Sequence, residues 1–138
     1  MTDTSTETRS VIVEREIAHP PEKIWRALTQ PHLIEEWLMK NDFKPETGHQ
    51  FTLSGDWGAV DCTVTEVEAN RSLAYTWDAF GLESVVTWTL TPTSNGTRLR
   101  MEQAGFKADA SHDQFYAGAE ASWPQFVAKL EDLLSRMD

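Results

Sequence analysis

The chain has 138 residues, a formal net charge of -10 at pH 7 and a pI near 4.7. A chain of this length buries roughly 68% of the surface that its unfolded form exposes, which predicts one hydrophobic core and a single domain. The negative charge argues against nucleic acid or an anionic membrane as a partner, because both would be repelled over most of the surface. No secretory leader pattern opens the sequence, and no apolar run approaches the ~18 residues that span a bilayer. We therefore expect a cytoplasmic protein.

The first residues form a tail and a strand. Residues 1–8 are polar and lack periodicity, so we expect a disordered tail and a domain over residues 9–138. Val11, Val13 and Ile17 alternate with polar residues, the period-two pattern of a half-buried strand. The strand should stop at Pro20 and Pro21, because neither residue has an N–H for the ladder.

Two short helices are predicted to follow this strand. Pro21 suits the first position of a helix, where a backbone N–H would lack a partner anyway, and Pro31 restarts the chain in the same way. Each predicted helix has an apolar face, formed by Ile24, Ala27 and Leu28 in the first and by Leu33, Ile34, Trp37 and Leu38 in the second. The two helices should form a bent arm that packs on the rest of the domain.

An antiparallel meander is predicted after a loop at 40–48. The five strands are expected at 50–54, 59–67, 72–78, 83–91 and 97–103, with turns that include the Gly-Asp-Trp-Gly segment at 55–58 and an Asn-Gly signal at 95–96. One side of this sheet is aromatic and the other mostly polar. A change of parity between Val64 and Val67 predicts a bulge near Thr65 and Glu66, which would help the sheet to curl. The aromatic side needs a cover.

The C-terminal segment is predicted to be a long helix that provides this cover. Its apolar residues recur at intervals of three and four, namely Phe115, Ala119, Ser122 with Trp123, Phe126, Leu130, Leu133 and Met137. Pro124 should disturb the helix, and Ser122 with Gln125 could cap a second half, so we expect a kink or a restart at 122–124. The predicted fold is α+β: a curved antiparallel sheet of six to seven strands, two short helices after the first strand, and a long helix across the concave face.

Several of these segments together resemble a known family. They are the strand, proline pair and helices at 15–37, followed by Gly48, Leu73–Trp77, Ser84–Leu90, Gly96–Leu99 and Gly105–Phe106. In this order they are similar to the C-terminal-domain type of activators of the ninety-kilodalton heat-shock protein ATPase, within the START-like (SRPBCC) helix-grip superfamily. The resemblance covers roughly residues 9–137. Members commonly open the last helix with a Gly-Trp pair, whereas this chain has Ser122-Trp123 followed by Pro124.

A helix-grip fold often keeps a cavity between sheet and helix, and large side chains of this chain are placed to line it. Rings and a thioether suit a flat or apolar small molecule. The candidate ligand-binding residues are Trp37, Phe51, Tyr75, Trp77, Trp88, Met101, Trp123 and Phe126. Alternatively, these side chains simply fill one another's space as a core. Trp37 and Trp123 are the stronger candidates for ligand contact, because they lie where helices meet the opening of the sheet.

No catalytic set is recognisable among the polar residues. Asp61, Tyr75, Glu102 and Gln103 are the polar candidates, and Asp61 and Glu102 should face solvent unless the bulge turns Asp61 inward. The histidines at 19, 32, 49 and 112 lack metal-ligand spacing, and Cys62, the single cysteine, is expected to be a small core residue. We expect a protein without a metal, a cofactor or catalytic residues.

Three classes of function remain open. The favoured one is binding of a small apolar or aromatic molecule by a monomer. The resemblance implies an alternative, stimulation of a chaperone ATPase through a protein interface, for which the acidic residues Glu35, Glu36, Asp42 and Glu46 are the candidate surface. A cyclase or hydrolase of the START-like kind rests on fold analogy alone.

Overall fold

The computed structural model describes residues 8–55, 58–79, 82–107 and 110–137. The predicted tail lies outside this range except for Thr8, with which the first strand begins. In chain order the elements are β1 (Thr8–Ile17), α1 (Pro21–Thr29), α2 (Pro31–Trp37), β2 (Lys40–Asn41), β3 (Gln50–Gly55), β4 (Gly58–Glu68), β5 (Ser72–Ala79), β6 (Leu82–Thr93), β7 (Gly96–Lys107) and α3 (Ala110–Arg136). The α+β class, the two short helices and the long C-terminal helix are confirmed.

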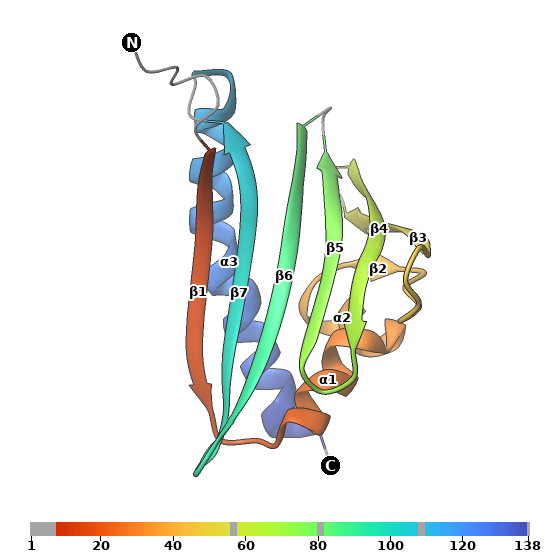
Figure 1. The fold of residues 1–138 in the computed structure, drawn as a ribbon, viewed down its shortest axis with the longest axis vertical. Coiled ribbons are helices and arrows are strands. Elements are labelled where there is room, and N and C mark those ends of the chain that lie inside the picture. The colour runs from red at the N-terminus through yellow and green to blue at the C-terminus, as the bar shows by residue number, and fades with distance from the viewer. Residues whose placement is uncertain (1–7, 56–57, 80–81, 108–109, 138) are drawn as a thin grey trace.

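The strands form one antiparallel sheet of seven, in the order β1-β7-β6-β5-β4-β3-β2 (Figure 1). The predicted meander is β3 to β7, and β1 closes the sheet by pairing with β7. The loop predicted at 40–48 contains the short strand β2, which pairs with β3 and forms the other edge. The predicted bulge is confirmed, because the register of β4 with β5 shifts between Val64 and Glu66.

The prolines begin α1 and α2 as predicted. Pro21 and Pro31 occupy the first turns of the two helices. Gln30 lies between the helices as the C-cap of α1 and the N-cap of α2. The apolar faces are buried at Ile24, Ala27, Leu28, Ile34 and Trp37. The arm therefore exists because two prolines each start a helix and because both helices have an apolar side to bury.

Gly96 permits a close contact between the backbone at the end of β1 and the β6–β7 hairpin. Its φ is +154°, and a Cβ at this position would lie 2.1 Å from the carbonyl oxygen of Ile17. Thr93 pairs with Gly96, so Ser94 and Asn95 form the turn and the glycine of the predicted Asn-Gly signal is the first residue of β7. The glycine is required here by the neighbouring backbone rather than by the turn itself.

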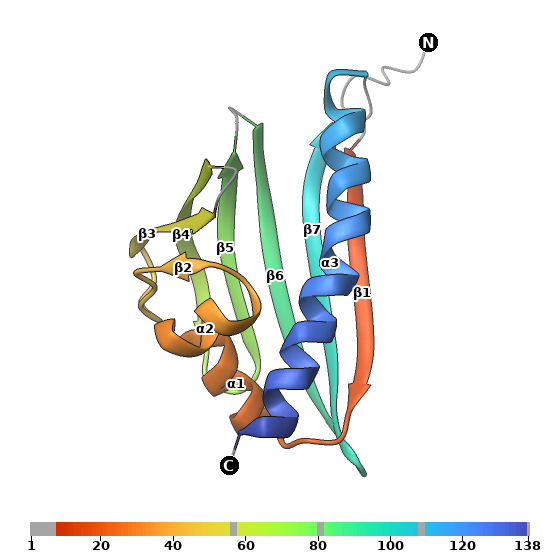
Figure 2. The ribbon, with the colours of Figure 1, turned by 180° about the vertical axis from the view of Figure 1, so that it is seen from behind.

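The helix α3 crosses the concave face from the end of the sheet near the N-terminus to the end near α1 (Figure 2). It covers β1 and β7, while α1, α2 and the segment around β2 lie in front of the other half of the sheet. The predicted apolar stripe is buried at Trp123, Leu130 and Leu133, but the stripe also includes Val127 and Leu134, which the prediction omitted. Phe115 lies outside the residues whose side chains are described.

The sequence predicted a kink or a restart at 122–124, and the restart is wrong. α3 runs without interruption through Pro124, and Gln125 does not cap a new helix but donates its side-chain N–H to the carbonyl of Ala121 at 3.0 Å. Glu120, whose carbonyl loses its helical donor at Pro124, is exposed, so water can replace that bond.

Within the described residues, no helix combines the length and hydropathy needed to cross a membrane.

Candidate functional site

All eight predicted lining residues face the concave side of the sheet. Six of them are buried, and Trp77 and Phe126 are partly buried and pack against the others. The structure thus brings the predicted set together. Together with Phe43, which was not predicted, its rings form two groups that meet at Trp88. They are the arm cluster (Trp37, Phe43, Phe51, Tyr75 and Trp88) and the grip cluster (Trp77, Trp123 and Phe126). Met101 pairs with Trp88 across β6 and β7.

The rings of the arm cluster enclose one another. Phe51 lies 5.0 Å from Phe43 and 5.3 Å from Tyr75 between ring centroids, and Trp37 meets Trp88 edge to face at 5.4 Å. Edge-to-face pairs at these distances are favourable contacts of a packed core. This part of the molecule matches the alternative that the predicted lining residues fill one another's space.

The polar atoms of the arm cluster are also used internally. The indole N–H of Trp37 donates to the carbonyl of Ala27 in α1 at 2.9 Å, and that of Trp88 donates to the Tyr75 hydroxyl at 3.0 Å. Burial raises the pKa of the Tyr75 hydroxyl well above its ordinary value, more than the bond from Trp88 lowers it. The Tyr75 hydroxyl therefore stays neutral at physiological pH and accepts the hydrogen bond from Trp88.

Phe43 is a member of the arm cluster that the sequence reasoning missed. It lies in the segment predicted as a loop, yet it is buried against Phe51 and Tyr75. Its backbone N–H is held by the side chain of Asn41 at 3.1 Å, which places the ring over the sheet. A single apolar residue in a polar segment was the available signal, but no periodicity marked it.

The grip cluster is the more accessible group. The ring of Trp123 on α3 lies 5.3 Å from that of Trp77 on β5 and 5.5 Å from that of Phe126. Trp123 also meets Trp88 at 5.8 Å, which joins the two clusters. Because Trp77 and Phe126 are only partly buried, this group forms an edge of the core at which apolar ring surface is open to solvent.

A chain of hydrogen bonds lies beneath the grip cluster. The indole N–H of Trp123 donates to the side-chain oxygen of Gln103 on β7 at 2.6 Å. The amide nitrogen of Gln103 donates to the Ser84 hydroxyl at 2.8 Å, and Ser84 donates to the backbone oxygen of Trp77 at 3.3 Å. Both Gln103 and Ser84 are buried. Gln103 was among the polar candidates in the sequence, whereas Ser84 was not.

Cys62 is a buried thiol on β4, as predicted, and it pairs with Phe51 across the strands. Burial, followed by the negative charges of Asp61 and Asp78, raises the pKa of the thiol from 9.0 to about 12. The thiolate, which is the nucleophile, is therefore absent at neutral pH.

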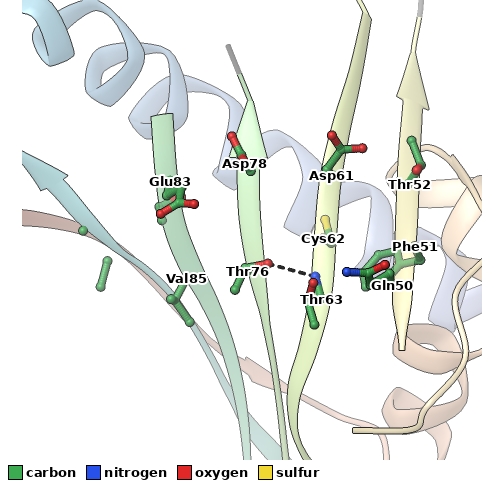
Figure 3. Close-up of a pocket in the computed structure, with 13 residues that line it drawn as sticks. Gln50, Phe51, Thr52, Asp61, Cys62, Thr63, Thr76, Asp78, Glu83 and Val85 are labelled. Atoms are coloured by element: carbon green, nitrogen blue, oxygen red, sulfur yellow. Dashed lines mark hydrogen bonds between the residues drawn. The ribbon is translucent and has the colours of Figure 1, made fainter. Parts of the chain in front are cut away.

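The outer face of the sheet has a hollow of about 710 Å³ over β3 to β7 (Figure 3). Asp61 and Asp78 are directly opposite each other on β4 and β5, and Asp78 is opposite Glu83 on β6. Thr76 lies beside them and accepts the backbone N–H of Thr63 at 2.8 Å. The sequence predicted a wet face here, and three like charges in one row make it acidic.

Neither candidate carboxylate is enclosed with the rings. The bulge does not turn Asp61 inward, because Asp61 is exposed on the outer face, and Glu102 forms an ion pair with Arg100 at 3.2 Å on the same face. Among the described residues, no group of three or more His, Cys, Asp or Glu side chains is arranged to hold a metal ion.

Comparison with known proteins assigns the chain to a family. The family model described as "Activator of Hsp90 ATPase homolog 1-like protein" matches residues 18–135. The chain belongs to this family. Its architecture, a curved antiparallel sheet gripped by a long helix, is that of the START-like helix-grip proteins, as the resemblance implied.

Solved structures agree with this assignment. Protein MLL2253 from Mesorhizobium loti is 60% identical, with a TM-score of 0.89 over 94% of this chain and 99% of that one. BH1534 from Bacillus halodurans is 30% identical, with a TM-score of 0.80 over 91% of this chain and 96% of that one. DynU16, a protein in the dynemicin biosynthetic locus, is 26% identical with a TM-score of 0.80, and the match covers 91% of this chain but 47% of DynU16. A search of the curated proteins found no match.

Proposed function

We propose that this protein binds a small apolar or aromatic molecule between the curved sheet and α3, at the grip cluster. The observation that supports this most directly is the partial exposure of Trp77 and Phe126, whose rings both contact the buried Trp123 ring. Soluble proteins gain stability by burying rings, so ring surface left open at the mouth of a fold is available to a ligand. The five rings of the arm cluster would serve as the packed wall behind the ligand.

The position of these residues supports the same proposal. Trp77 comes from the sheet while Trp123 and Phe126 come from α3, so a molecule resting on these rings would contact both layers of the grip. A 26%-identical relative occurs in a biosynthetic locus, which is in keeping with a small organic molecule as ligand. Aromatic surface with few polar groups favours a flat, largely uncharged molecule.

The proposal is tested by a thermal-shift screen of the purified protein against flat aromatic and lipid-like molecules, with tryptophan fluorescence on every hit. A ligand at 100 times its Kd adds about 2.7 kcal/mol, which raises the Tm by about 5 to 10 °C in a domain of this size. Phe126→Ala should remove the shift because it deletes one side of the site. Leu133→Ala is the matched control, since it shortens a buried residue of the same helix away from these rings. A hit that stabilises Phe126→Ala as much as the unaltered protein would exclude this site.

The family description favours a second candidate, stimulation of a chaperone ATPase through a protein interface. Glu35 and Glu36 are exposed on α2 and Asp42 and Glu46 are exposed close by in the chain, so the acidic surface that such an interface needs is accessible. Reversing the charge of Glu35 and Glu36 should then weaken binding to an Hsp90-type chaperone and reduce the gain in ATPase rate. Absence of binding by the unaltered protein would remove this candidate.

A further inference from the structure

Gln103 is a polar side chain inside an apolar grip, with 3% of its surface exposed. It follows Leu99 and Met101 on the inward side of β7, where the period of the strand would place another apolar residue. A buried amide is costly unless its hydrogen-bonding groups are used. The hydrogen-bond partners of the amide oxygen and nitrogen therefore show which of its groups is left for a ligand.

The orientation of the amide follows from its partners. An indole N–H can only donate, so the atom of Gln103 that lies 2.6 Å from the Trp123 nitrogen has to be the oxygen. The amide nitrogen then faces Ser84. Ser84 has one hydroxyl hydrogen, which it donates to the backbone oxygen of Trp77, so it accepts from Gln103. The whole chain of donors runs in one direction, from Trp123 to the backbone of β5.

With this orientation, one of the two amide hydrogens of Gln103 is left without an acceptor among the described residues. The amide nitrogen carries two hydrogens, and the bond to Ser84 uses one of them. The second meets no acceptor in the part of the chain that the structure describes. An unmet buried donor costs free energy comparable to that of a lost hydrogen bond, so it gains most from a partner brought in by a ligand.

This N–H lies close to the grip cluster. Gln103 is bonded to Trp123, whose ring contacts both partly buried rings, Trp77 and Phe126. The Tyr75 hydroxyl does not lie at the grip cluster, because it is surrounded by the enclosed rings of the arm cluster. A molecule resting on the grip cluster would thus have the Gln103 amide within reach of its edge.

We propose that Gln103 selects, among flat apolar ligands, those that carry a hydrogen-bond acceptor oxygen, by donating its second amide N–H to that oxygen. This rests on the proposed function, and it names the ligand class as an aromatic ring system with a carbonyl group at its edge. A ring system without the oxygen leaves the buried N–H unmet, so it binds about tenfold more weakly. Gln103 acts as a specificity residue that touches the ligand.

The test uses two matched pairs of probes, 1-tetralone with tetralin and 9-fluorenone with fluorene. Within each pair the shape is nearly the same and the carbonyl oxygen is the difference. The Kd of each probe is measured by calorimetry on the full-length protein and on Gln103→Met, which keeps the length of the side chain and removes the amide. We expect the ketone of a pair to bind about tenfold more tightly to the unaltered protein and equally to Gln103→Met.

Thr97→Val is the matched control variant. Thr97 is buried on the same strand and donates its hydroxyl to the carbonyl of His19 at 2.8 Å, far from Trp123. This variant also removes a buried hydrogen bond of β7, one where Gln103→Met removes two, but it should keep the preference for the ketone. Loss of the preference in both variants would mean that it reports on strand stability, and the assignment to Gln103 would be wrong.

A second measurement needs no variant. In NMR spectra of the unaltered protein, one of the two side-chain amide protons of Gln103 should move downfield when a ketone binds and should stay in place with its hydrocarbon. Equal affinities for ketone and hydrocarbon, with no proton shift, would overturn the role of Gln103 and leave the proposed function standing. If neither member of either pair binds, the proposed function at the grip cluster fails and this inference fails with it.

Discussion

The arm cluster and the grip cluster contain the same kinds of residue but differ in how far their rings are enclosed. In the arm cluster the rings are buried, and the two indole N–H groups meet acceptors within the protein. In the grip cluster two of three rings are partly exposed, and a buried amide beneath them keeps an N–H that no described residue accepts. The arm cluster thus has the enclosed rings of a packed core, whereas the open ring edges and the spare donor of the grip cluster are the features on which the proposed binding surface rests.

The outer face of the sheet shows a parallel contrast. Behind the strands β1 and β7 the charges alternate, with Glu16 paired to Arg98 at 3.2 Å and Glu14 to Arg100 at 3.6 Å. Behind the grip cluster, Asp61, Asp78 and Glu83 repeat the same sign across three strands. At the end of the molecule that holds the grip cluster, both faces of the sheet therefore stabilise the fold less. The inner face has partly exposed rings there, and the outer face has like charges side by side.

The largest expected effect is the loss of stability when the ring that joins the clusters is removed. Trp88 has no exposed surface and contacts Trp37 and Trp123 while its N–H bonds to Tyr75. Trp88→Ala should lower the free energy of unfolding by about 3 to 5 kcal/mol, as measured by urea denaturation.

Trp77→Ala is the comparison for this prediction. Its ring is partly exposed, so we expect a loss of about 1 to 2 kcal/mol, because less apolar area leaves water on folding. Equal losses in the two variants would show that the grip cluster is as much a part of the packed core as Trp88.

The pH dependence of stability should reveal the burial of Cys62 beside the arm cluster. Its pKa is raised from 9.0 to about 12 in the folded protein, so the unfolded chain loses the thiol proton first as the pH rises. Stability is then lost above pH 9, by about 1.4 kcal/mol per pH unit from this group, and the loss ends as the pH passes the folded pKa. The measurement is urea denaturation at pH 8 to 10.5.

Cys62→Ala separates this effect from other groups that titrate at high pH. The substitution changes stability at all pH values but removes the ionisation, so its curve should fall less steeply above pH 9. Parallel curves for the variant and the unaltered protein would contradict a raised thiol pKa. The high pKa also predicts that iodoacetamide leaves Cys62 unmodified at pH 8 until the protein is unfolded.

A smaller effect is expected from the indole N–H of Trp37. Trp37→Phe keeps a ring in the arm cluster but removes the bond to Ala27 in α1, so it should cost about 1 to 2 kcal/mol. Binding of a ligand at the grip cluster should keep its affinity, which fluorescence from the remaining tryptophans can measure. A large loss of affinity would show that the two clusters do not act separately.

The smallest effect is a gain in stability on the outer face. Asp78 lies between two carboxylates, so Asp78→Asn removes two unfavourable pairs and should add about 0.5 kcal/mol. The gain should diminish in 1 M salt, where charges are screened. Thr87→Asn, on the same face but opposite Glu102 and Ala74, is a control that removes no charge and should give no salt-dependent gain.

Prediction from sequence succeeded for elements whose local signals agree. The prolines at 21 and 31, the alternation along the strands and the change of parity after Val64 each correspond to one backbone feature, and the structure confirms all of them. It failed on the restart at Pro124, where the helix continues because apolar residues on both sides of the proline pack against the same core. Phe43 was missed for the opposite reason, since its burial comes from distant residues.

The sequence by itself determined the element order, the inward side of each strand and the eight large side chains that gather there, because these depend on spacing along the chain. It did not separate enclosed rings from partly exposed ones, since Tyr75 and Trp77 are two positions apart on the same face of the same strand. The tertiary structure decides which rings are enclosed. Whether a ring is enclosed, and whether the N–H of a buried amide finds an acceptor, depends on residues brought from other strands and from α3, and no local pattern contains that information.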